Sequence, residues 1–354
     1  MSRQRGFALV LVLWVLSLLT IMAGSFALSM RREAAIVTGS SSNARGMAIA
    51  ESGLALAELM LMHPDQQQRW RTDSSIYQVD YADASLRIQL LAETGKIDIN
   101  SADEQMLQGL IAQVPVEPEQ QTRLINAILD WRDADNLVRI DGAEKKEYKA
   151  AGLSYQPGNK PFRSIEELQL VLGMNEQVFK PLENLITVYA KQPKVDLVQA
   201  PKEVLQILPG MDAALIDTYI AARRDSAING LAAPTFVLRD GVYTLSVAEP
   251  GEAPRTLRDS GSVKTGRQSA LGSEANNANG APALSGAVTI ISEALLDDDT
   301  TATLKVLIKK AGGAGSSPFQ ILKWQRNPAA DESLFTDEKD ESLVRQYAEP
   351  QFND

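Results

Sequence analysis

The stretch RGFALVLVLWVLSLLTIMAGSFALSMR, residues 5–31, decides the fold of this chain. Between its two terminal arginines no charged residue occurs. At the rise of ~1.5 Å per residue of an α-helix, the segment from Phe7 to Leu28 reaches about 33 Å, which is enough to cross the hydrocarbon core of a bilayer. The sequence therefore predicts a membrane-spanning helix over residues 7–30.

The six residues before this helix determine how the chain enters the membrane. In a secretory signal the cleavage site follows the apolar region, so the membrane segment is removed with it. Here a short basic stretch ends in Gly6 and the aromatic Phe7 opens the helix, an order that resembles the leader of type IV prepilins. In that family a prepilin peptidase cleaves after the glycine, whose missing Cβ suits an extended backbone, and methylates the new amino terminus. The resemblance implies a leader over residues 1–6, cleavage between Gly6 and Phe7, and N-methylation of Phe7.

One position departs from the common prepilin pattern. Most members of the family have Glu as the fifth residue after the cleavage site, where it pairs with the charged amino terminus of a neighbouring subunit. This chain has Leu11 there. Because a carboxylate inside a bilayer is costly and is kept only for a purpose, its loss removes a contact used in stacking subunits. The branch of the family that lacks this Glu is the K-type minor pseudopilin of type II secretion, which lies at the filament tip. The alternative interpretation of the helix is a membrane anchor of a protein outside this family.

The composition excludes several classes of function. A net charge of −10 argues against a general binder of polyanions, because neutralising phosphates requires clustered Lys and Arg. The chain has no cysteine, so it can form neither a disulfide nor a thiol nucleophile. His63 is the only histidine, and its place before Pro64 indicates the end of a helix rather than a catalytic or zinc-binding residue. At 354 residues, the chain is long enough for two folded units beyond the membrane helix.

After the membrane helix the hydrophobic pattern changes type. Alternating apolar and polar residues predict a hairpin of strands at Ile76–Tyr81 and Ser85–Leu90, and helical periodicity follows from Ile97 to Arg224. Further strand patterns come after the helical block, and we expect them to join the first two in one sheet. They are Thr235–Leu238, Val242–Val247, Ala287–Ile291, Thr303–Ile308 and Phe319–Trp324.

These patterns predict an α+β fold. A type IV pilin-like long N-terminal helix would pack on an antiparallel sheet, and a large all-helical domain would be inserted between the strands. Gly, Ser and Asn predict a flexible loop at 251–286, and acidic residues predict a disordered tail. The expected divisions are a leader 1–6, a transmembrane helix 7–30, a stalk helix 31–63, the first strands of the pilin-like domain 64–95, an inserted helical domain 96–230, the remaining strands 231–327 and the acidic tail 328–354.

The helical block contains an internal repeat. Ile97–Leu110 aligns with Val195–Leu208, and both carry an Asp-x-x-x-Ala pattern that resembles the start of a helix-hairpin-helix (SAM-like) unit. Such units often hold DNA through backbone amides and a basic residue at the hairpin. In the second unit the hairpin Leu208–Met211 is followed by Asp212, whose carboxylate would stand where a phosphate must come. We therefore expect a protein scaffold without a nucleic-acid partner, with DNA contact as the alternative.

Carboxylates are densest in residues 130–147, in a loop that leaves a helix. Calcium takes six to eight oxygen ligands, which such a loop can supply, although the spacing is not that of an EF-hand and a solvated acidic loop is the alternative. The segment Asp-Trp-Arg-Asp-Ala-Asp with the later Gly-Ala-Glu resembles a region of the calcium-binding K-type pseudopilins, but Lys145 and Lys146 replace acidic residues usual there. The candidate ligands that we infer are Asp133, Asp135 and Glu144, with Asp141 as a further candidate.

The resemblance runs from the leader to Ile321–Trp324 and implies a K-type minor pseudopilin of type II secretion. Such a protein crosses the inner membrane once, has a large periplasmic C-terminal region, and initiates or limits the filament that exports folded proteins across the outer membrane. It catalyses no reaction, and its partners are the I-type and J-type minor pseudopilins, the major pseudopilin, prepilin peptidase and the inner-membrane assembly platform. The alternatives are a minor pilin of a type IV filament that contacts DNA and a membrane-anchored periplasmic hydrolase.

Overall fold

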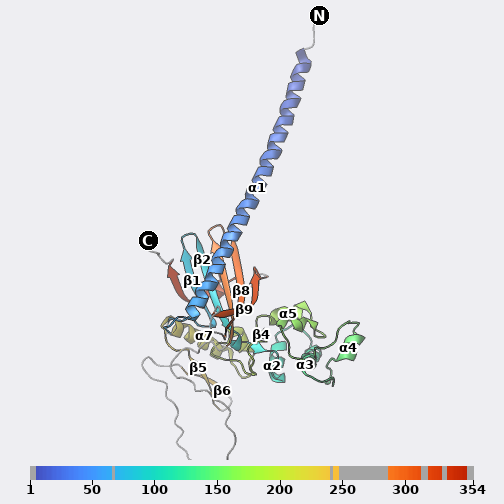
Figure 1. The fold of residues 1–354 in the computed structure, drawn as a ribbon, viewed down its shortest axis with the longest axis vertical. Helices are drawn as coiled ribbons and strands as arrows, with labels where there is room; N and C mark the ends of the chain where they lie inside the picture. Colours follow the sequence, from blue (N-terminus) through green and yellow to red (C-terminus); the bar gives the residue numbers. More distant parts are fainter. Residues whose placement is uncertain are drawn as a thin grey trace, which may run out of the picture.

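The computed structural model describes residues 5–65, 68–239, 242–246, 286–311, 318–328 and 333–348. Helix α1, Arg5–Leu61, is 57 residues long, and its N-terminal half projects away from the rest of the molecule (Figure 1). The predicted span and stalk are therefore parts of one continuous helix. The predicted flexible loop 251–286 lies outside the described residues apart from Gly286.

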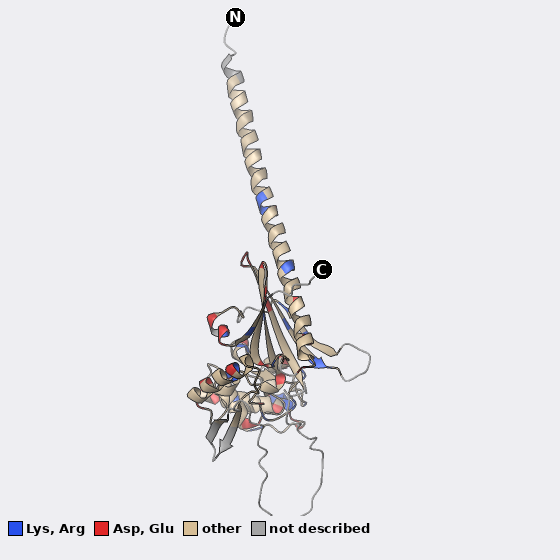
Figure 2. Cartoon of the chain, turned by 90° about the vertical axis from the view of Figure 1, so that its left-hand side faces the viewer, with Lys and Arg blue, Asp and Glu red and all other residues tan. Residues whose placement is uncertain are grey.

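The projecting half of α1 is apolar around its whole circumference. From Leu9 to Met30 it carries no charged residue, and Figure 2 shows the first arginines of the described side chains only beyond this stretch. Among the described residues it is the one helix that is long and apolar enough to cross a membrane, with a mean hydropathy of 2.4, and none of its most apolar window is buried inside the molecule. A helix that is hydrophobic on all sides but unburied needs an apolar solvent, so α1 fits the predicted single-pass anchor.

The C-terminal part of α1 packs on a six-stranded sheet. The strand order is β10-β1-β2-β7-β8-β9, and all neighbours are antiparallel except β1 and β10. The helix approaches β7 closely at Gly53, because a Cβ there would lie 2.2 Å from Ser292 Oγ. Around this contact the buried residues of helix and sheet form one hydrophobic core, which includes Ala50, Leu54 and Ala57. The strands are β1 Asp73–Tyr81, β2 Ala84–Ala92, β7 Ala287–Leu296, β8 Thr301–Lys310, β9 Phe319–Arg326 and β10 Leu343–Ala348.

The α+β class and the β1–β2 hairpin are confirmed, but the acidic tail differs from its prediction. The sequence predicts disorder over residues 328–354, whereas helix α8, Asp337–Asp340, and strand β10 lie within it. Strand β10 pairs in parallel with β1, Val344 is buried, and the Tyr347 hydroxyl accepts a hydrogen bond from Trp70 Nε1 at 3.1 Å. The prediction of disorder is wrong here because the run of acidic residues hid the apolar strand that follows it.

Between β2 and β7, which are neighbours in the sheet, the chain forms a second unit with its own core. Its buried residues run from Ile97 to Tyr219 and are almost all contributed by helices and the loops between them. The chain enters and leaves the first half of this unit through two short parallel strands, β3 Ile97–Asp98 and β4 Ile186–Thr187. The other elements are η1 Glu93–Gly95, α2 Glu104–Ile111, α3 Pro118–Arg132, α4 Lys145–Ala150, η2 Ile165–Leu170, α5 Glu176–Leu182, α6 Lys202–Ile207 and α7 Ala213–Ile228.

Two strands predicted for the main sheet belong elsewhere. Strands β5, Thr235–Arg239, and β6, Val242–Ser246, form a separate antiparallel hairpin. Phe236 packs against the core of the helical unit, with its ring centroid 4.1 Å from that of Tyr219 on α7. The prediction of a single sheet is wrong for this hairpin, because alternation predicts a strand but does not say which surface the strand covers.

Candidate functional site

The predicted processing site lies at the start of α1. The structure describes the backbone from Arg5 and places Gly6 and Phe7 in the first helical turn, not in the extended conformation that peptidase recognition predicts. The first four N–H groups of a helix have no intrahelical acceptor, so unwinding this turn breaks few hydrogen bonds. One turn further along, Leu11 is 53% exposed on the apolar surface of α1. The cleavage, the methylation and the role of Leu11 remain predictions.

Three carboxylates come together where α3 ends and α4 begins. Asp130 and Asp133 belong to the last turn and C-cap of α3, and Glu144 is the N-cap of α4. Asp130 is fully buried, and its Oδ2 accepts hydrogen bonds from the backbone amides of Arg139 at 3.3 Å and Ala143 at 2.9 Å. These two bonds fold the connecting loop back onto the helix. We call Asp130, Asp133 and Glu144 the carboxylate cluster.

The carboxylate cluster has more acceptor oxygens than donors. In the described part of the chain, Asp130 Oδ1 and Asp133 Oδ1 are buried without a hydrogen-bond partner, and the buried Glu144 carboxylate has only the backbone amides that open α4 beside it. Arg139 supplies one positive charge, with Nε 3.2 Å from Asp130 Oδ1 and Nη2 3.1 Å from Asp133 Oδ2. Burial and the charge of Asp133 raise the pKa of Asp130; burial and the charges of Asp130 and Asp133 raise the pKa of Glu144. Buried carboxylate oxygens without donors are costly, and additional positive charge would relieve that cost.

Two of the four predicted ligands, Asp133 and Glu144, lie in the carboxylate cluster. Asp135 lies at its edge, since its charge contributes to the raised pKa of Glu144 while its Oδ1 accepts a hydrogen bond from the amide of Leu137 at 2.8 Å. Asp141 is exposed in a turn with φ of 60°, and no contact with the cluster is recorded for it in the described chain.

The prediction of ligands omitted Asp130, which is the most buried carboxylate of the cluster. It stands one helical turn before Asp133, and that i, i+3 spacing was the available signal. In the described residues no group of three His, Cys, Asp or Glu side chains is preassembled as a metal centre. The donors that converge are nevertheless hard oxygens, which is the ligand chemistry that calcium prefers.

Both predicted helix-hairpin-helix units are present, formed by α2 with α3 and by α6 with α7. In each unit an arginine of the second helix donates to backbone carbonyls of the loop that opens the unit. Arg132 Nη2 donates to the carbonyl of Ala102 at 2.7 Å, and Arg223 Nη1 donates to the carbonyl of Ala200 at 2.7 Å. Ala102 and Ala200 are equivalent positions of the sequence repeat. The repeat is therefore a structural device that satisfies the loop carbonyls from within the unit.

The hairpins of these units are poor sites for a phosphate. At the start of α7, Asp212 Oδ2 accepts hydrogen bonds from the amides of Ala214 and Leu215 at 3.1 and 3.3 Å. At the start of α3, the N-cap is Glu117 and the first helical residue is Pro118, which has no N–H. In the second unit, the carboxylate of Asp212 thus occupies the amides that a phosphate would use. In the first unit, Pro118 removes one such amide and the carboxylate of Glu117 lies beside the rest. This arrangement favours a scaffold over DNA contact.

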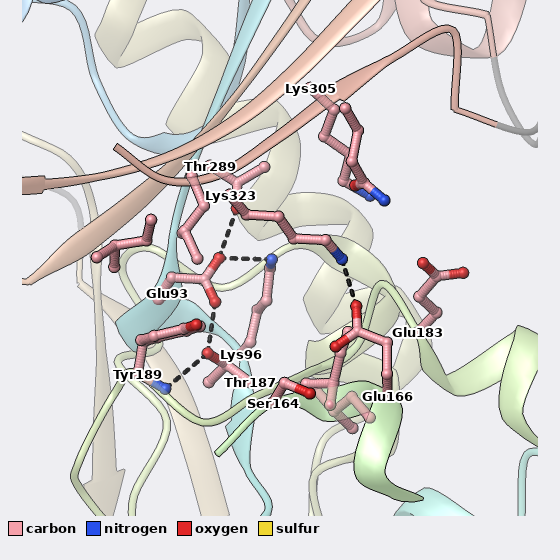
Figure 3. Close-up of a pocket in the computed structure, with 15 residues that line it drawn as sticks. Glu93, Lys96, Ser164, Glu166, Glu183, Thr187, Tyr189, Thr289, Lys305 and Lys323 are labelled. Carbon is pink, nitrogen blue, oxygen red and sulfur yellow. Dashed lines mark hydrogen bonds and ion pairs between the residues drawn. The ribbon is translucent and has the colours of Figure 1, made fainter. Parts of the chain in front are cut away.

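A buried carboxylate links the sheet to the helical unit. Glu93, which follows β2, is only 3% exposed and accepts hydrogen bonds from side chains on both sides (Figure 3). Its Oε1 accepts from Lys96 Nζ at 2.6 Å and from Thr289 Oγ1 of β7 at 2.7 Å, and its Oε2 accepts from Thr187 Oγ1 of β4. Because every partner comes from a different segment, Glu93 holds the helical unit in one orientation on the sheet.

A second polar link lies at the other end of the helical unit, where α7 meets β1. Arg71 Nη1 donates to Ser226 Oγ at 2.9 Å, and Arg223 Nε lies 3.9 Å from Asp73 Oδ2, with both of the latter residues buried. Each of these two attachments of the helical unit to the sheet is thus built around a buried carboxylate.

Known proteins resemble the region that contains these sites. A family model for protein K of the type II secretion system matches residues 85–191. Type II secretion system protein K of Klebsiella pneumoniae is 30% identical over 200 residues, which are 51% of this chain and 61% of that protein. The protein of the same description from Aeromonas hydrophila is 26% identical over 209 residues, which are 51% of this chain and 62% of that protein. The chain thus covers less than two thirds of the length of these relatives.

Among solved structures, the GspK-GspI-GspJ complex of the type 2 secretion system of enterotoxigenic Escherichia coli contains a similar chain. The two chains superpose with a TM-score of 0.44 and 15% identity, and the match covers 85% of this chain and 99% of that chain. The match to the family model spans the Glu93 link, the first helix-hairpin-helix unit and the carboxylate cluster. Together, the family model and the relatives confirm the predicted resemblance: the chain is similar to protein K of type II secretion systems.

Proposed function

We propose that this chain is a minor pseudopilin at the tip of the type II secretion pseudopilus. There it would initiate or limit assembly of the filament that exports folded proteins across the outer membrane. The observation that carries the proposal is the position of the helical unit, which lies at the end of the sheet remote from the N-terminus of α1 (Figure 1). In a filament whose subunits pack by their N-terminal helices, this is the side on which the next head would stack.

The size and attachment of the helical unit support this role. It has its own hydrophobic core and is held by the buried links at Glu93 and at Arg223, so it forms a firm obstacle to a further subunit. Leu11 supports the same position, because a subunit without the usual carboxylate lacks one contact used to stack beneath another. The work of the protein is then assembly and not catalysis.

The proposal includes processing and partners. Prepilin peptidase would cleave between Gly6 and Phe7 and methylate Phe7, leaving α1 as a single span of the inner membrane with the rest of the chain in the periplasm. The I-type and J-type minor pseudopilins would bind beside this chain, and the major pseudopilin and the assembly platform would follow in the growing filament. Mass spectrometry of the membrane form tests the first step, since a mature N-methylated Phe7 is expected and an intact residue 1 would contradict it.

Calcium is proposed as the ion of the carboxylate cluster. Asp130, Asp133 and Glu144 would hold it, with Asp135 at the edge, and the ion would supply the positive charge that the buried oxygens lack. Bound calcium would fix the loop between α3 and α4 and thereby the outer surface of the helical unit.

Single-site labelling tests the position in the filament. The chain has no cysteine, so Gln120→Cys on the exposed surface of α3 provides one unique thiol for a gold label. In pseudopili assembled with all partners, we expect one label at one end of each filament. Labels distributed along the filaments would contradict the proposal, and the unchanged cysteine-free chain is the control for non-specific labelling.

A further inference from the structure

A cavity of about 290 Å³ lies where the helical unit meets the edge of the sheet (Figure 3). Strands β8 and β9 contribute one wall, and the segments around η2 and β4 contribute the other. The cavity is separate from the carboxylate cluster, which lies between α3 and α4. Cavities at the junction of two folded units are common ligand sites, and the residues that line this cavity indicate which ligand it can bind.

Three lysines line the cavity, and two of them are neutralised. Lys96 Nζ pairs with Glu93 at 2.6 Å, and Lys323 Nζ pairs with Glu166. Lys305 differs, since its Nζ donates to the neutral Asn184 Oδ1 at 2.9 Å and makes no ion pair with a described carboxylate.

The one further carboxylate among the residues that line the cavity, Glu183, compensates Lys305 only in part. Glu183 lines the same space, but its Oε2 lies 3.7 Å from Lys180 Nζ. Burial, followed by the charges of Lys96 and Lys323, lowers the pKa of Lys305, while Glu183 and Glu93 oppose this effect. The lysine is therefore a partly buried cation in a place where its charge is unfavourable, and an incoming anion would relieve this cost.

The remaining lining limits the kind of anion. Ile165, Ile186, Leu307 and Leu322 give the cavity aliphatic walls, and Tyr189 is the aromatic residue at its side. Fully hydrated inorganic anions are poorly matched to such walls, whereas a carboxylate carried on a short aliphatic body can use both the walls and the amine. We infer that this cavity is a binding site for a carboxylate on a short aliphatic body, held by a charge-assisted hydrogen bond from Lys305 Nζ.

A carboxylate of this kind has two sources, a free organic acid or the end of a polypeptide chain. The inference does not depend on the proposed place in a filament, because it concerns the isolated chain.

Calorimetric titration of the full chain in detergent tests the site. The probe is N-acetyl-leucine, and N-acetyl-leucinamide is its uncharged counterpart. We expect the acid to bind about tenfold more tightly than the amide or better, because hydrogen bonds to charged groups contribute that much. A tetrapeptide ending in Leu, with a free or an amidated end, distinguishes the two sources: tighter binding of the free-ended peptide than of N-acetyl-leucine identifies a chain end, and the reverse identifies a free acid.

Variants of two lysines on β8 make the result specific. Lys305→Met should remove the preference for the acid, Lys305→Arg should retain most of it, and Lys309→Met, which changes an exposed lysine outside the cavity, should leave it unchanged. Thermal unfolding of each variant shows whether it is folded. Equal affinity for acid and amide, absence of acid binding, or full acid binding by a folded Lys305→Met chain would each overturn the inference.

Discussion

The two helix-hairpin-helix units begin alike and end in different chemistry. In both, an arginine of the second helix binds the carbonyls of the opening loop. After Arg132 the first unit leads into the carboxylate cluster, in which Asp130 Oδ1 and Asp133 Oδ1 lack hydrogen-bond donors. In the second unit Arg223 also faces Asp73 of the sheet and α7 is attached to β1. The difference teaches that the arginine serves folding in both units, while the residues around it form a cluster of buried carboxylates in one unit and an attachment to the sheet in the other.

The largest effect is expected from breaking the attachment. Arg223→Met removes the carbonyl contacts and also leaves Asp73, which is 3% exposed, without its cation. Removing one member of a buried ion pair costs about 3–5 kcal/mol, so we expect a loss of about 3 kcal/mol in the free energy of unfolding. Urea unfolding of the full chain in detergent measures it. The double variant Arg223→Met with Asp73→Asn should recover part of the loss, and a single variant within 1 kcal/mol of the wild type, on the scale of a neutral hydrogen bond, would show that the pair is unimportant.

The next effect concerns the ion proposed for the first unit. Calcium at about 100 times its Kd should raise the free energy of unfolding by ~2.7 kcal/mol, since it binds only the folded chain. Glu144→Gln should abolish both this gain and calcium binding measured by calorimetry. Asp141→Asn is the matched control and should retain them, because Asp141 is exposed and the described residues show no contact between its side chain and the cluster. A chain that gains nothing from calcium, or an Asp141→Asn chain that loses the gain, would contradict the assignment of these ligands.

A smaller effect is expected from the equivalent arginine of the first unit. Arg132→Met removes charge-assisted hydrogen bonds to the carbonyls of Ile99 and Ala102, which should cost about 1–2 kcal/mol. The cost is lower than for Arg223 because the Arg132 side chain is only partly buried and forms no close ion pair with a carboxylate of the described residues. Urea unfolding under the conditions used for Arg223→Met gives the comparison. Equal losses for the two variants would mean that attachment to the sheet adds nothing to the second arginine.

The smallest change in the free energy of unfolding is expected from an exposed ion pair of the second unit. Lys202 Nζ and Asp217 Oδ1 form an exposed ion pair between α6 and α7 at 2.8 Å. Exposed pairs contribute little because water and salt screen them, so Asp217→Asn should change the free energy of unfolding by less than about 0.5 kcal/mol. A change above about 1 kcal/mol in the same urea assay would show that contacts on the surface of the second unit matter as much as its buried ones.

The site was predictable from the sequence only in part. Asp133 and Glu144 were found because carboxylates are dense around them, but density cannot say which carboxylate turns inward. Asp130 turns inward because the amides of Arg139 and Ala143 bind it, and Gly142 permits this, since a Cβ there would lie 2.1 Å from Asp130 Oδ2. These contacts depend on the path of a loop, which local pattern does not determine.

What the sequence determined by itself is local in origin. The long apolar helix, the β1–β2 hairpin, the repeat and the α+β class follow from periodicity, turn residues and composition within short windows. The tertiary structure alone decided the long-range matters: that β10 returns to pair with β1, that the β5–β6 hairpin covers the helical unit, and that Glu93 joins two cores. The physical reason is that each of these depends on which distant surface offers apolar area and hydrogen-bond partners, and only the folded chain brings those surfaces together.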